Sequence, residues 1–193
     1  MVFCEIDSNN ILVEPLRNRT EGELIKTYQK LIDRLKSYGI RPKHHILDNE
    51  ASEAFKATIV TNGMDYQLVP PHIHRRNLAE RAIQTWKDHF IAIMSGVDKS
   101  FPRNMRDLLI PQAELTLNLL RQSNMTPRIL AYAHLHGRFD YNKHTLAPMG
   151  SAVQMHEKPT QRKTWAPHSI DGWYVGTSLE HYRAHKFVQE RPR

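Results

Sequence analysis

The sequence contains one cysteine, Cys4, and no apolar run longer than a handful of residues. A single cysteine excludes a disulfide framework and every zinc module that is built on several cysteines. The short apolar runs exclude a membrane-spanning helix. Met1 leads directly into a strand-like segment instead of a signal peptide, so we expect an intracellular protein of the nucleus or cytoplasm.

Acidic residues are in the minority. The chain has 27 Lys and Arg against 20 Asp and Glu, a formal charge of +7 and a pI near 9.6. The excess lies in the second half, because residues 98–193 carry a net charge of +6 and residues 1–97 only +1. A basic surface favours a polyanion such as nucleic acid, although simple solubility explains a charge of this size equally well.

Apolar periodicity and turn residues predict an α/β protein with two domains, residues 1–140 and residues 145–193. Thr20 and Glu23 form the pattern of a capping box at the start of a helix. After Leu146, short alternating runs between Pro and Gly predict a small all-β unit. The expected strands are 2–7, 11–14, 44–47, 66–69, 152–155, 172–176 and 185–188, and the expected helices are 20–38, 51–62, 77–94, 108–120 and 126–136.

Two carboxylates occupy positions typical of a metal site. Asp48 follows the predicted strand 44–47, where an open α/β sheet presents its functional groups. Glu80 lies in the first turn of the predicted helix 77–94. Mg²⁺ binds few carboxylates, and a pair of such ions can promote phosphodiester chemistry. The pattern alone favours solvated surface charge, because an Asp after a strand and a Glu on a helix are common in α/β proteins.

The start of the helix 77–94 also offers cations. Arg75 and Arg76 are candidates for phosphate contact at a helix N-terminus, with ordinary solvated charge as the alternative. The helix has a polar face of Asn77, Glu80, Gln84 and Lys87 and, beside it, an apolar stripe of Ala79, Ile83, Trp86 and Phe90 that we expect to anchor it.

Histidines and aromatic residues elsewhere have plainer interpretations. The pairs His72/His74 and His134/His136 lack a third metal ligand, so we expect them to be polar surface residues. Four aromatic residues in the C-terminal part could stack bases, but packing in a small β core is the stronger expectation. They are Trp165, Trp173, Tyr174 and Tyr182.

Four segments resemble parts of retroelement integrases. Residues 45–55 (HILDNEASEAF) resemble the second-aspartate motif, a strand that ends in Asp-Asn-Gly and is followed by Phe. Residues 68–87 (LVPPHIHRRNLAERAIQTWK) resemble the third-acid motif, in which a strand, a Pro, a loop and Asn lead into a helix with the last catalytic Glu. Residues 113–127 are similar to the helical tail of copia- and gypsy-type integrases, and residues 147–176 to their small SH3-like domain.

This resemblance implies a ribonuclease-H-like fold, a mixed sheet flanked by helices, followed by an SH3-like unit. Asp48 and Glu80 would be the second and third acids of a DDE triad that binds Mg²⁺ or Mn²⁺. Gln84 and Lys87 would meet the DNA end, together with Arg75, Arg76 and Asn77. The parent enzyme would be a homo-oligomer that carries out 3′-end processing and strand transfer on DNA.

The chain departs from the integrase pattern in three places. Glu50 replaces the expected Gly, and residues 72–76 (HIHRR) replace a Pro-Gln-Ser-Asn-Gly type loop. The first catalytic Asp should lie on a strand before the hairpin 2–13, so we expect a truncated and inactive fragment. Asp7 is better explained as a turn cap than as a substitute. The alternatives are a non-catalytic, domesticated or remnant DNA-binding module and another ribonuclease-H-like nuclease.

Overall fold

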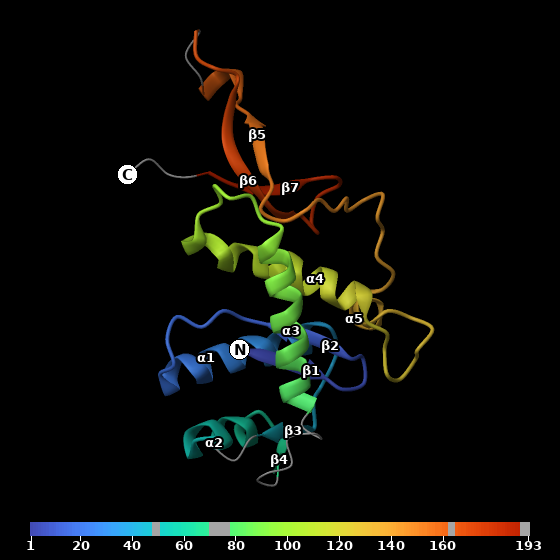
Figure 1. The fold of residues 1–193 in the computed structure, drawn as a ribbon. Coiled ribbons are helices and arrows are strands. Elements are labelled where there is room, and N and C mark those ends of the chain that lie inside the picture. The colour runs from blue at the N-terminus through green and yellow to red at the C-terminus, as the bar shows by residue number, and fades with distance from the viewer. Residues whose placement is uncertain (48–50, 70–77, 162–164, 190–193) are drawn as a thin grey trace. The chain divides into compact units, whose positions relative to one another are not determined.

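A computed structural model of the chain describes residues 1–47, 51–69, 78–161 and 165–189. Its elements alternate between strand and helix as far as α3 and are then helical up to the final strands (Figure 1). Each strand and helix expected from the sequence is present, most with bounds displaced by a few residues. In chain order the elements are β1 (Val2–Glu5), β2 (Asn10–Val13), α1 (Glu21–Ser37), β3 (His44–Leu47), α2 (Glu53–Thr61), β4 (Asp65–Leu68), α3 (Leu78–Ser95), η2 (Arg103–Leu109), α4 (Ile110–Leu120), α5 (Ala131–His136), β5 (Ala152–His156), η3 (Pro159–Gln161), β6 (Ser169–Thr177) and β7 (His185–Val188).

The chain forms two compact units, and α3 and α4 contribute residues to both. One unit comprises Met1–Asp88 and Leu117–Gly137, and the other comprises His89–Thr116 and Arg138–Arg193. The expected division into domains 1–140 and 145–193 stays a prediction. Throughout the described residues, no helix has both the length and the apolar character needed to cross a bilayer.

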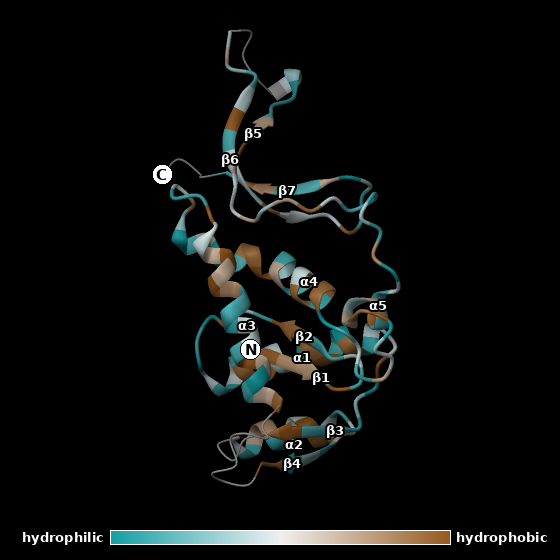
Figure 2. Cartoon of the chain, turned by 45° about the vertical axis from the view of Figure 1, so that its right-hand side comes forward, coloured by the Kyte–Doolittle hydropathy of each residue, from teal (hydrophilic) through white to brown (hydrophobic). Residues whose placement is uncertain are grey.

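The first unit contains two short sheets. β1 and β2 form an antiparallel hairpin in which Val2 lies opposite Val13, and Figure 2 shows the apolar colouring of this hairpin. β3 and β4 are parallel, with Leu47 opposite Leu68 at their last residues. Within the described part of the chain no backbone ladder joins β1 to β3. Their side chains do meet, since the rings of Phe3 and His45 have centroids 5.2 Å apart.

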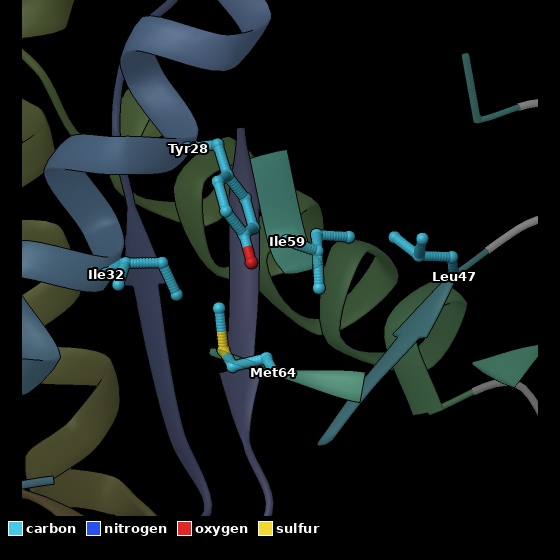
Figure 3. Packing of buried hydrophobic residues seen from close by; sticks show 5 residues of the cluster. All are labelled: Tyr28, Ile32, Leu47, Ile59 and Met64. Atoms are coloured by element: carbon cyan, nitrogen blue, oxygen red, sulfur yellow. The ribbon is translucent and has the colours of Figure 1, made fainter. Parts of the chain in front are cut away.

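A buried apolar cluster holds the β3–β4 pair against two helices (Figure 3). Tyr28 and Ile32 come from the buried face of α1, Ile59 from α2 and Leu47 from the end of β3, while Met64 lies in the turn that leads into β4. Tyr28 and Ile59 have no exposed surface. Full burial of an aliphatic or aromatic side chain stabilises a fold by about 1.5–3 kcal/mol, so this cluster fixes the strand pair that carries the candidate site.

The outer edge of β2 is closed by a side chain. The backbone N–H of Ile11 donates to Oδ1 of Asn118 at 2.9 Å, and Nδ2 of Asn118 donates to the Ile11 carbonyl at 2.9 Å. Nearby, the Arg121 guanidinium donates to the Asn9 carbonyl at 2.9 Å. The amide of Asn118 therefore replaces one residue of a neighbouring strand, and it satisfies two backbone groups that burial would otherwise leave unpaired.

The second unit contains the antiparallel sheet β5–β6–β7. Trp173 and Tyr174 of β6 are buried, as the core interpretation predicted, whereas Trp165 and Tyr182 are 98% and 68% exposed. The Tyr174 hydroxyl donates to Oε1 of Gln112 at 2.6 Å, and the same oxygen accepts the Thr177 N–H at 2.8 Å. An SH3-like topology for this unit stays a prediction.

Two local predictions about helix starts were wrong. The Thr20 hydroxyl donates to Oδ1 of Asn18 at 2.6 Å and forms no cap, because a nearby Asn side chain competes for it. The helix predicted over 126–136 begins only at Ala131. Residues before it form a turn in which the Ile129 N–H donates to the Thr126 carbonyl, and the Ser123 N–H donates to the Ile129 carbonyl.

Candidate functional site

The parallel pairing of β3 and β4 defines the edge at which the candidate site lies. Both strands end together, at Leu47 and Leu68. The chain continues from Leu47 into Asp48 and from β4 toward α3, which begins at Leu78. Parallel strands present the residues after their carboxyl ends at the same edge of a sheet. Asp48 itself lies outside the described residues.

The polar face predicted for α3 is exposed. Glu80 lies in the first turn, and Gln84 and Lys87 follow at helical spacing. All three are exposed, and Nε2 of Gln84 donates to Oδ1 of Asp88 at 2.7 Å. A carboxylate in the first turn is favoured by the partial positive charge of a helix N-terminus. The other predicted DNA contacts, Arg75, Arg76 and Asn77, lie outside the described residues.

The apolar stripe expected to anchor α3 is only partly buried. Ala82 is the buried residue of this helix, and Trp86 and Phe90 are half-buried. Ile83, which the spacing placed in the stripe, is 49% exposed, and Ile91 is 56% exposed. The buried side of α3 is therefore centred on the small side chain of Ala82, one position away from Ile83 of the predicted stripe. Ile83 and Ile91 contribute less buried apolar surface than the spacing predicted.

A basic pocket of about 300 Å³ adjoins α3. Arg81 and Thr85 line it from the helix, and Cys4 and Arg121 line it from β1 and from the segment after α4. Burial raises the pKa of the Cys4 thiol, and the nearby guanidinium of Arg121 opposes this shift. The sequence motif singled out Glu80 and did not include Arg81, the next residue. The position of Arg81 beside a candidate catalytic acid could have indicated it.

Other sequence candidates have structural roles. The Glu5 carboxylate, not Asp7, caps the turn after β1, because it accepts the backbone N–H groups of Asp7 at 3.1 Å and Ser8 at 2.7 Å. Nδ1 of His134 lies 2.8 Å from Oγ of Ser123. In the portion of the chain that the structure describes, no group of three or more His, Cys, Asp or Glu side chains is arranged to hold a metal ion.

Comparison with solved structures finds the fold of this chain in two integrase structures. The catalytic core domain of BIV integrase matches with a TM-score of 0.51 and 17% identity, over 69% of this chain and 82% of that one. A chain of the simian T-cell lymphotropic virus intasome, in complex with the PP2A regulatory subunit B56 gamma, matches with a TM-score of 0.57 and 16% identity, over 98% of this chain and 72% of that one.

Sequence comparisons give no further support. No protein-family model matches the chain, and no curated protein matches it either. Identities of 16% and 17% carry information about fold and not about activity. The chain therefore has a mixed α/β fold similar to that of retroviral integrase catalytic cores.

Proposed function

We propose that this chain is part of a retroelement integrase of copia or gypsy type and that it binds DNA during integration. One observation carries the proposal. On an integrase-like fold, the parallel strands β3 and β4 end together at Leu47 and Leu68, and the sequence continues from these ends into Asp48 and toward Glu80. The basic second half of the chain, with its net charge of +6, would add affinity for the DNA backbone.

The residues at this edge fit Mg²⁺ or Mn²⁺. Both ions take oxygen ligands, and Mg²⁺ in particular keeps most of its water and needs only one or two protein carboxylates. Asp48 and Glu80 would supply them, and the exposure of Glu80 leaves room for phosphate oxygens. When bound, such a metal activates the attacking water or hydroxyl and stabilises the leaving oxygen of the phosphodiester. Lys87 and Gln84, on the same exposed face, would orient the DNA end.

The proposed triad is incomplete within these 193 residues. The first catalytic Asp would lie on a strand that precedes β1. We therefore expect the chain alone to bind duplex DNA and to lack strand-transfer activity, and the parent enzyme to be a homo-oligomer.

A strand-transfer assay with labelled element-end DNA and Mn²⁺ tests this proposal. The chain alone should bind the duplex in a salt-sensitive manner and yield no joined product. Robust joining that Asp48→Asn abolishes would refute the incomplete triad. Failure to bind duplex DNA at low salt would refute the integrase proposal as a whole.

Two other functions predict different results. A non-catalytic DNA-binding module keeps its duplex affinity in a variant that combines Asp48→Asn with Glu80→Gln, even with divalent ions present. A ribonuclease-H-like nuclease would instead cleave an RNA–DNA hybrid in preference to duplex DNA.

A further inference from the structure

A second basic pocket lies at the opposite end of the β3–β4 pair from Asp48. It has a volume of about 460 Å³. Lys36 lines it from the last turn of α1, and Arg41 and Lys43 line it from the segment that enters β3. Asn62 and Met64 line it from the turn between α2 and β4. The segment from Lys36 to Lys43 thus brings three cations to one depression, and residues 62–64 form its other wall.

The ammonium of Lys36 is positioned by an amide. Its Nζ donates to Oδ1 of Asn62 at 3.0 Å. The side chain of Asn62 is itself fixed, because its Nδ2 donates to Oε1 of Gln29 at 2.9 Å and to the Thr58 carbonyl at 3.0 Å. A neutral amide orients the cation and leaves its charge uncompensated, so Lys36 is held in place with its full positive charge toward the pocket.

Arg41 and Lys43 are exposed and form no ion pair with any of the described residues. Two acids lie in the neighbourhood. Asp33 accepts a hydrogen bond from Nε2 of Gln29 at 2.8 Å. Asp65, the first residue of β4, donates its backbone N–H to the Lys43 carbonyl at 2.9 Å. Neither carboxylate forms a salt bridge with the three cations.

The partial negative charge at the C-termini of α1 and α2 is too small to neutralise the three cations. Gly39 follows α1 with φ +81°, and Gly63, which lines the pocket, follows α2 with φ +77°. A helix C-terminus carries about −0.5 elementary charge, so the two ends contribute about −1. The lining formed by the described residues has three cations and no carboxylate, and Asp33 and Asp65 are not part of it. The pocket therefore retains positive charge for an anion.

We propose that this pocket holds a backbone phosphate of duplex DNA, an assignment that rests on the proposed function. The lining has no aromatic side chain on which a base could stack. Its one side-chain amide, Asn62, is already hydrogen-bonded to Gln29 and Lys36. Lys and Arg side chains around a small depression suit a phosphate oxyanion. The contact would position the duplex and carry no sequence information.

The length of β3 relates the two ends to DNA. A strand of four residues spans about 13 Å, which equals the axial rise of about four base pairs of duplex DNA. A duplex of about 20 base pairs is therefore long enough to reach from the basic pocket to the edge after Leu47. The pocket would fix the position of the duplex relative to the acids.

Anisotropy measurements with a labelled 20-base-pair duplex and the full chain test this proposal. The variant R41A/K43A should weaken binding about tenfold and reduce the slope of log K against log salt by about 2, as expected for two lost phosphate contacts. The control K26A/K30A removes the same charge from exposed positions on α1 and should weaken binding less than threefold. The pair R41Q/K43Q, checked by circular dichroism, repeats the test with larger side chains.

A second measurement separates the sources of phosphate. Inorganic phosphate, titrated into the labelled chain, should shift the amide resonance of Gly63 in the unmodified chain and not in R41A/K43A. Equal loss of duplex affinity in the pocket and control variants overturns the proposal, as does a phosphate-induced shift with unchanged duplex affinity. If the unmodified chain binds no duplex, both this proposal and the proposed function fail. If the unmodified chain binds duplex and the pocket variants lose no more affinity than the control, the pocket proposal alone fails.

Discussion

The two ends of the β3–β4 pair differ in charge and in the way their residues are brought together. At the carboxyl ends, Asp48 and Glu80 belong to segments that leave one sheet edge. At the amino ends, Lys36, Arg41 and Lys43 surround a pocket between two glycine turns. Under the proposed function, the acids would hold a metal ion at one end and the cations would hold a DNA phosphate at the other. The strand pair of four residues would then separate these two sites.

The largest expected effect comes from the core that supports both ends. Ile59 is fully buried in the cluster beneath the strand pair, whereas the next residue of α2, Val60, is 59% exposed. Ile59→Ala should lower the free energy of unfolding by about 3–4 kcal/mol, and Val60→Ala by less than about 1 kcal/mol. Urea denaturation measures both. Equal costs would show that the cluster does not support the strand pair.

A smaller effect concerns pH and the middle of β3. Burial lowers the pKa of His45 to about 4, and the neighbouring charge of His44 adds to the shift. The unfolded chain, with a His pKa near 6.5, then binds more protons than the folded chain between pH 6.5 and 4. Stability is full above about pH 6.5 and falls as the pH drops toward 4, by on the order of 2 kcal/mol.

Paired variants isolate this titration from that of the carboxylates. His45→Gln should reduce the loss of stability between pH 6.5 and 4.5, measured by urea denaturation at each pH. The adjacent His44→Gln is the control, because His44 is exposed and its removal should leave most of the pH dependence in place. An unchanged pH profile in His45→Gln would contradict the prediction.

The smallest effect sharpens the contrast in charge. Without divalent ions, the carboxylates of Asp48 and Glu80 repel the DNA backbone, so D48N/E80Q should raise duplex affinity about threefold. The change has the opposite sign to the one expected for R41A/K43A. The control E21Q/E180Q neutralises two exposed acids outside both sites and should change affinity less than twofold. A loss of affinity in D48N/E80Q would show that these acids do not face DNA.

Short-range features of the fold were predictable from sequence, and long-range contacts were not. Apolar periodicity and turn residues located the strands and helices because these patterns act within a few residues. The capping box at Thr20 failed because Asn18, only two residues away, binds the hydroxyl. The pairing of Asn118 with Ile11 joins residues 107 positions apart, and no local pattern indicates it.

The candidate site divides in the same way. Exposure of Glu80, Gln84 and Lys87 on one helix face follows from their spacing, and it was predicted. In sequence, each cation of the second pocket resembles ordinary solvated charge. Lys36 and Lys43 line one pocket because the turn from α1 into β3 packs beside residues 62–64, which follow α2. The acidic site therefore stays a prediction from sequence, and the basic pocket was not predicted from it.

The amide of Asn118 has a consequence for how copies of this chain behave at high concentration. An open strand edge offers unpaired N–H and C=O groups on which another chain can add a strand and begin to aggregate. Asn118 occupies both backbone groups of Ile11 at the outer edge of β2. One side chain thus removes the backbone groups of Ile11 from the sites at which another chain could pair with this edge of the hairpin.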